Sequence, residues 1–161
     1  MIAERENVQV TEEKDFLQQK TQGSRNEMEI VFDAVSCNES FARVAVAAFI
    51  THLNPTLEEL ADIKTAVSEA VTNAVIHGYQ EKEGIITLEA SVEDRLLTII
   101  VQDDGIGMED VEKAMEPMYT SRPGERSGMG FSFMEAFMDQ VEVVSAPGKG
   151  TTVTMRKKIG R

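Results

Sequence analysis

The chain has 161 residues, of which 42% are hydrophobic and 27% charged, as expected for one globular domain with a single core. Its net charge of -12 argues against nucleic-acid binding, which needs a basic surface, but is compatible with a basic protein partner. The longest apolar run, Val44 to Ile50, is too short to cross a bilayer. The N-terminus does not have the form of a signal peptide, and the single cysteine, Cys37, permits no intrachain disulfide. We therefore expect a cytoplasmic protein.

Residues 1–25 are polar and charged without periodicity, and we interpret them as a flexible N-terminal extension to a domain spanning residues 26–161. Hydrophobic and polar residues alternate over residues 28–32, which predicts a half-buried strand at the start of the domain. Apolar residues at helical spacing predict a helix from Asn38 to Leu53, with Asn38 as its N-cap.

A capping box, Thr56 to Glu59, predicts the start of a second helix, which Gly78 terminates. One side of this helix is apolar: Leu60, Ile63, Val67, Ala70, Val71 and Ala74.

The rest of the chain alternates between strands and helices. We predict strands over residues 85–92, 96–102, 141–145 and 151–157, and helices over residues 110–115 and 130–138. This mixture, with hairpins in place of regular βαβ units, predicts the α+β class. We expect a two-layer α/β sandwich in which helices cover one face of a mixed sheet.

Glu69, Asn73 and His77 are spaced four residues apart and share one face of the second helix. An amide oxygen is a suitable ligand for a Mg²⁺ ion that also holds phosphate oxygens. A carboxylate one turn earlier could deprotonate or orient an attacking hydroxyl. A solvated helix face is the alternative interpretation of this spacing.

Two glycine-containing segments follow. Asp103 ends a buried strand before Gly105 and Gly107, where a carboxylate could accept a hydrogen bond from an adenine amino group; an ordinary acidic turn is the alternative. Gly128 and Gly130 open a helix whose free amides could bind phosphate, although many helix starts carry such a pair without binding anything.

In order and spacing these motifs resemble those of the GHKL ATPase/kinase superfamily. Ser68–Tyr79 is similar to its asparagine box, and three later segments are similar to its glycine boxes: Asp103–Gly107, Arg126–Phe131 and Gly150–Val153. Over residues 26–157 the chain resembles the sporulation anti-sigma factors of endospore-forming bacteria, a family of serine kinases within that superfamily.

The resemblance implies a Bergerat-type fold, a homodimer and Mg-ATP bound under a mobile lid. It implies that Glu69 is the catalytic base and that Asn73 is the Mg²⁺ ligand. It also implies that Asp103 binds the adenine base and that Arg43 contacts a protein partner. It assigns the rest of the ATP site to Gly105, Gly107, Arg126, Ser127, Gly128, Met129, Gly130 and Thr151.

Two partners are implied: a sigma factor of the sigma-F type, held inactive, and an anti-anti-sigma protein that is phosphorylated on a serine. The alternatives are a general-stress-type anti-sigma kinase and a binding-only module that uses ATP structurally. We do not expect a histidine kinase catalytic domain, because residues 1–25 contain no histidine. Nor do we expect a mechanical ATPase, because the chain is too short to include a transducer domain.

Overall fold

Five segments of alternating hydrophobicity form one sheet in the computed structural model, which describes residues 25–117 and 130–160. In spatial order the strands are β1 (Asn26–Asp33), β2 (Ile85–Glu93), β3 (Leu96–Asp103), β5 (Thr151–Lys158) and β4 (Gln140–Ser145). The helices are α2 (Asn38–Phe49), α3 (Leu57–Asn73), α4 (Val111–Ala114) and α5 (Gly130–Phe137), with a 3₁₀ turn η1 (Thr51–Leu53) and a π-helix η2 (Ala74–Gly78). The predicted extension lies outside the described residues apart from Arg25, and it stays a prediction.

All four pairs of neighbouring strands are antiparallel, so the prediction of a mixed sheet was wrong. After β1 the chain runs along α2 in one direction and along α3 in the other. β2 then begins at the end of the sheet where β1 finished, so the two strands pair antiparallel. β3 and β4 do run in the same direction, but β5 lies between them and pairs with both. The parallel relation therefore exists only between strands that are not neighbours.

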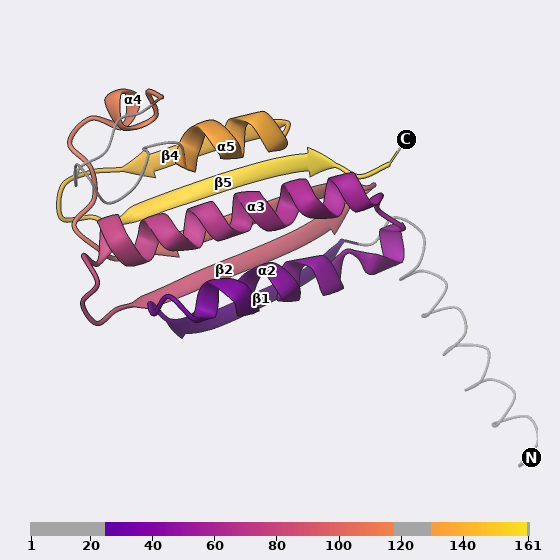
Figure 1. Ribbon diagram of the computed structural model, residues 1–161, viewed down its shortest axis with the longest axis horizontal. Helices are drawn as coiled ribbons and strands as arrows, with labels where there is room; N and C mark the ends of the chain where they lie inside the picture. The colour runs from indigo at the N-terminus through magenta and orange to yellow at the C-terminus, as the bar shows by residue number, and fades with distance from the viewer. Residues whose placement is uncertain (1–24, 118–129, 161) are drawn as a thin grey trace, which may run out of the picture.

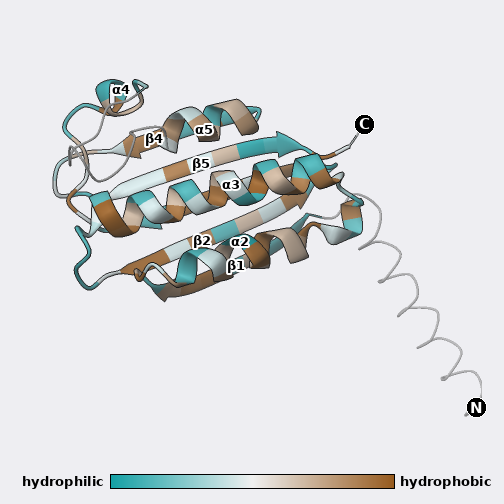
Figure 2. Ribbon diagram, in the orientation of Figure 1, coloured by the Kyte–Doolittle hydropathy of each residue, from teal (hydrophilic) through white to brown (hydrophobic). Residues whose placement is uncertain are grey.

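Helices α2, α3 and α5 lie on one face of the sheet, as predicted for a two-layer sandwich (Figure 1). On α3 the side chains of Ile63, Val67 and Val71 are fully buried, and polar residues occupy the other side, so brown and teal alternate along this helix in Figure 2. The core lies between this layer and the sheet, where it includes Leu88 and Ile99.

The two ends of α3 are built differently. At its start the predicted capping box is present: Thr56 Oγ1 accepts from the Glu59 amide at 3.1 Å, and Glu59 Oε2 accepts from the Thr56 amide at 2.9 Å. At its end the helix widens into η2, in which the Tyr79 amide donates to the Ala74 carbonyl at 2.9 Å. Such π-turns concentrate at functional sites because they redirect side chains. The periodicity predicted a helix here but not this widening.

The N-cap predicted for α2 was wrong. Cys37 occupies the N-cap position and makes no side-chain capping bond. Asn38 is the first residue of the helix, and its side-chain amide donates to the Asp33 carbonyl at 2.9 Å. The side chain closes the connection from β1 to α2, and this contact with a residue five positions earlier competes with capping.

The β2–β3 hairpin turns at Asp94 and Arg95, which both have positive φ as a two-residue turn requires. The Arg95 guanidinium donates to the carbonyls of Ile159 at 2.6 Å and Leu53 at 2.7 Å, which ties this end of the sheet to the C-terminal strand and to η1. Within residues 25–117 and 130–160, no helix combines the length and the apolar composition needed to traverse a membrane.

Candidate functional site

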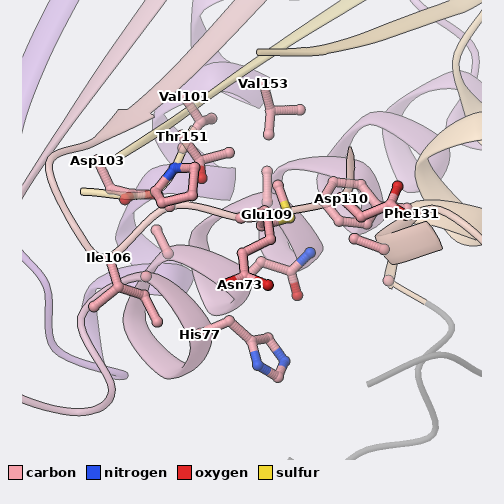
Figure 3. A pocket seen from close by; sticks show the side chains of 18 of the residues that line it. Asn73, His77, Val101, Asp103, Ile106, Glu109, Asp110, Phe131, Thr151 and Val153 are labelled. Carbon is pink, nitrogen blue, oxygen red and sulfur yellow. The ribbon is translucent and has the colours of Figure 1, made fainter. Parts of the chain in front are cut away.

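A cavity of about 610 Å³ lies at the end of the sheet where α3, β3 and β5 meet α4 and the start of α5. Polar, charged and glycine residues contribute to its lining: Asn73, His77, Gly78, Asp103, Gly107, Glu109, Asp110, Lys113, Gly130 and Thr151. Its apolar lining consists of Ala70, Ala74, Val101, Ile106, Met108, Ala114, Phe131, Pro147 and Val153. Figure 3 shows Asp103 and Ile106 on one side of the cavity and Phe131 on the other, with Asn73 of α3 and His77 of η2 between them. An apolar cavity with few polar groups is the usual form of a small-molecule site.

Asp103 is the only buried charged or polar residue among the described residues, with 6% of its surface exposed. Burial raises the pKa of its carboxyl group above 3.8, and the neighbouring charge of Asp104 acts in the same direction. Hydrogen bonds from the backbone of Gly105 and Thr151 oppose that rise in pKa. The Gly105 amide donates to Asp103 Oδ1 at 2.9 Å. The result is an oriented hydrogen-bond acceptor at the edge of the cavity.

Glycines allow the backbone to approach this carboxylate. A Cβ on Gly78 would lie 2.8 Å from Asp103 Oδ1, so only glycine leaves room for the side chain in this position. A Cβ on Gly105 would collide with the Gly78 carbonyl, against which the turn after β3 is packed. The Ile106 amide donates to that same carbonyl at 2.9 Å. The end of η2 and the end of β3 are thus held together at the cavity.

A serine hydroxyl supports the neighbouring wall. Ser145 Oγ accepts from the Met108 amide at 2.9 Å, donates to the Gly150 carbonyl at 2.8 Å and lies 2.9 Å from Thr151 Oγ1. Gly107, just before Met108, has φ of +70°, which favours glycine. Ser145 therefore connects the glycine turn after β3 with the start of β5, where Thr151 enters the site.

The other end of the cavity combines a helix start with an amide and a carboxylate. Gly130 is the first residue of α5, and a Cβ there would lie 3.1 Å from Asn73 Nδ2 and 3.2 Å from Glu69 Oε2. Asn73 lines the cavity, whereas Glu69, one turn earlier, is not among the lining residues. The absence of a side chain at position 130 lets the amino end of α5 approach both groups, where its dipole favours an anion.

The structure brings together most of the residues that the motifs predicted. Asn73, Asp103, Gly107, Gly130 and Thr151 line the cavity, and Gly105 and Glu69 contact residues that do. Four predicted residues lie outside the described part of the chain: Arg126, Ser127, Gly128 and Met129. Arg43 is not in the cavity; it lies on α2, half exposed, with its guanidinium 3.4 Å from Glu39.

Sequence reasoning missed three positions that shape the site. Gly78 was interpreted only as a helix end, although it makes room for the Asp103 carboxylate. Tyr79 and Ser145 each join two backbone segments through a hydroxyl group. A tyrosine after a helix-terminating glycine and a serine at a strand end carry no signal of such contacts.

In residues 25–117 and 130–160 no group of three or more His, Cys, Asp or Glu side chains could hold a metal ion.

Comparison with known proteins identifies the family of the chain. The family model described as the histidine kinase-like ATPase domain matches residues 37–157. Anti-sigma F factor of Clostridium acetobutylicum is 63% identical over 134 residues, which cover 83% of this chain and 94% of that protein. Anti-sigma F factor of Caldanaerobacter subterraneus subsp. tengcongensis is 61% identical over 137 residues, or 84% and 96% of the two chains. The chain therefore belongs to the anti-sigma F factor family.

Solved structures agree on the fold. The structure of the RsbU and RsbW domains of a Mycobacterium tuberculosis protein aligns with a TM-score of 0.61 at 22% identity, over 84% of this chain and 32% of that one. A mycobacterial sensor histidine kinase, MprB, aligns with a TM-score of 0.52 at 14% identity, over 81% of this chain and 97% of that one. At these identities the likeness concerns the fold alone.

Proposed function

We propose that the cavity binds ATP, with adenine at Asp103 and the phosphates directed toward the start of α5. The observation that carries this proposal is the pairing of two features in one cavity. A buried carboxylate lies at one end, and a side-chain-free helix start beside an amide and a carboxylate lies at the other. The volume of about 610 Å³ is within the range of small-molecule sites. The adenine amino group would donate to Asp103, and the apolar walls would cover the base.

The residues present also fit a Mg²⁺ ion that accompanies the nucleotide. Mg²⁺ binds oxygen ligands and commonly keeps water and substrate phosphates among them, so one protein side chain is sufficient. We assign that ligand to Asn73, whose amide borders the cavity beside Gly130. Bound there, the cation would neutralise charge on the phosphate oxygens.

We assign the catalytic base to Glu69. The serine hydroxyl oxygen of a protein substrate attacks the γ-phosphorus, the bond to the β–γ bridging oxygen breaks, and ADP leaves. Glu69 accepts the hydroxyl proton, because its carboxylate lies one helical turn before Asn73 at the phosphate end of the site. The other phosphate contacts are assigned to Arg126, Ser127, Gly128, Met129 and Gly130.

The second activity is inhibition of a sigma factor, which agrees with the name of the relatives. The net charge of -12 would speed the encounter with a basic partner. This effect on the association rate would weaken as the salt concentration rises. Arg43 on α2 lies outside the cavity, so it can contact a partner while the nucleotide is bound. We propose that a homodimer holds a sigma factor of the sigma-F type. When the homodimer phosphorylates the anti-anti-sigma protein, it releases that sigma factor.

Transfer of label from γ-labelled Mg-ATP tests the kinase. The purified protein is incubated with the anti-anti-sigma protein of the same organism, and the phosphorylated residue is identified. We expect phosphoserine on that partner. Glu69→Ala should lower the rate of transfer by at least about 100-fold, the usual contribution of a general base, while ATP binding stays close to that of the unchanged protein.

Glu58→Ala is the matched control, since Glu58 is an exposed carboxylate on the same helix. Normal transfer by Glu69→Ala would refute the assignment of the base. ATP binding by the unchanged protein without any transfer, alongside an active control kinase, would favour a binding-only module or a general-stress-type partner.

A further inference from the structure

The hydroxyl group of Tyr79 lies between the ends of two neighbouring strands. It accepts from the Asp104 amide at 2.8 Å and donates to the Ile85 carbonyl at 2.5 Å. In the register of β2 and β3, Ile86 is opposite Asp103, so Ile85 would be opposite Asp104 if the ladder continued. The tyrosine hydroxyl therefore takes the place of the next direct contact between the two strands, and the ladder ends at Asp103.

Two contacts fix the tyrosine in this place. Its amide donates to the Ala74 carbonyl at 2.9 Å, which is the five-residue bond of the π-helix η2. Its ring packs directly against Gly84, where a Cβ would collide with the ring carbons. The widened helix end and the missing side chain at position 84 together direct the phenol toward the strand ends.

The backbone that Tyr79 holds is the backbone that orients Asp103. The peptide after the bridged Asp104 amide carries the Gly105 amide, which donates to Asp103 Oδ1 at 2.9 Å. Gly105 also packs against the Gly78 carbonyl, to which the Ile106 amide donates. Without the phenol hydroxyl, Asp104 is free to close directly onto Ile85. That closure would draw the turn away from Gly78 and rotate the donor that orients the carboxylate.

We propose that Tyr79 is a positioning residue that sets the adenine-reading geometry of Asp103, and with it the preference for ATP over GTP. This inference rests on the proposed function, because it specifies how the same pocket selects its nucleotide. The adenine amino group donates to a carboxylate, whereas the corresponding guanine oxygen is an acceptor and is repelled by it. Discrimination between ATP and GTP therefore depends on where the Asp103 oxygens point. A displaced Asp103 carboxylate would lower this discrimination.

The test compares Tyr79→Phe with Arg95→Lys. Both changes disturb hydrogen bonds between a side chain and two backbone segments, and they act just beyond opposite ends of β3. Dissociation constants for ATP and GTP are measured by calorimetry, together with the thermal unfolding midpoint. In Tyr79→Phe we expect ATP affinity to fall about tenfold, which is comparable with the net contribution of one hydrogen bond, with GTP affinity nearly unchanged. Arg95→Lys should lower the midpoint and leave the ATP-to-GTP ratio as it was.

Gly84→Ala reaches the same phenol by another route and serves if Tyr79→Phe does not fold. A methyl group there displaces the ring, so the ATP-to-GTP ratio should fall in this variant as well. In the phosphotransfer assay the KM for ATP should rise in both variants, with kcat at saturating ATP close to the unchanged value.

An unaltered ATP-to-GTP ratio in Tyr79→Phe, or in Gly84→Ala if Tyr79→Phe does not fold, would overturn the role of Tyr79. An equal loss of that ratio in Arg95→Lys would overturn it too, because general destabilisation would then explain the effect. A lack of preference for ATP in the unchanged protein would overturn it as well, whereas a failure of the unchanged protein to bind ATP at all would refute the proposed function itself, which is a distinct result.

Discussion

Replacing Asp103 with asparagine removes one hydrogen-bond acceptor from the site, because one of the two carboxylate oxygens becomes an NH₂ group. The carboxylate receives hydrogen bonds from the backbone of Gly105 and Thr151, and in the proposed complex it also receives one from the adenine amino group. Asparagine has one acceptor oxygen and one NH₂ group. With the amide oxygen turned toward the Gly105 amide, the NH₂ group takes the place of the other carboxylate oxygen and offers the adenine amino group a donor instead of an acceptor.

Leaving one buried donor unpaired costs about 1–3 kcal/mol, which corresponds to roughly 5- to 150-fold in the dissociation constant for ATP. Calorimetric titration of Asp103→Asn with Mg-ATP measures this loss. Asp104→Asn is the matched control, because Asp104 is the adjacent carboxylate and is exposed. An ATP affinity in Asp103→Asn equal to that of the control would refute the adenine contact.

The same substitution makes a separate prediction about pH. Burial raises the pKa of Asp103 in the folded protein above 3.8, so the folded state binds this proton more tightly than the unfolded chain. The contribution of Asp103 to the free energy of unfolding is complete below pH 3.8. It is lost as the pH rises through the pKa of this carboxyl group in the folded state. Asparagine does not titrate, so the stability of the unchanged protein relative to Asp103→Asn should decline over that interval. A constant difference in urea midpoints across the interval would contradict the raised pKa.

Three further variants test the site and its support. Asn73→Ala should weaken ATP binding in the presence of Mg²⁺ and have little effect in EDTA, which titrations under both conditions will show. Gly105→Ala should lower the free energy of unfolding by about 1–3 kcal/mol, because its Cβ collides with the Gly78 carbonyl; chemical denaturation measures this. Glu59→Gln tests the lowered pKa of Glu59, whose carboxylate accepts from the Gly160 and Thr56 amides. The unchanged protein should be the more stable of the two above pH 4.5, and its advantage should vanish as the pH falls through the lowered pKa; urea midpoints over that range measure it.

Local patterns in the chain were sufficient for most of the elements. The alternating residues of β2 and the capping box of α3 act over a few residues, so each predicts its element without knowledge of the fold. The order of the boxes containing Asn73 and Asp103 was equally readable, and both residues line the cavity. The predictions of β2 and of the start of α3 were confirmed because the contacts that define those elements are close in sequence, whereas the roles of Asn73 and Asp103 stay predictions.

The antiparallel sheet could not be derived in this way. Its order depends on two helices crossing one face and on β5 entering between β3 and β4, which are choices of the whole chain. The side chain of Asn38 likewise prefers the Asp33 carbonyl to the cap position, because that contact closes the loop after β1. A capping propensity is not realised where another contact takes up the same side chain.

The details that shape the cavity belong to the tertiary structure. Gly78 is a helix terminator by sequence, yet in space it leaves the room that the Asp103 carboxylate occupies. Tyr79 is an ordinary aromatic residue by sequence, yet its hydroxyl joins backbone groups of Ile85 and Asp104. The chain encodes which groups are available, through patterns that act over a turn or a strand. Only packing decides which of them meet, because hydrogen bonds and steric exclusion operate over a few ångströms between segments that are distant in sequence.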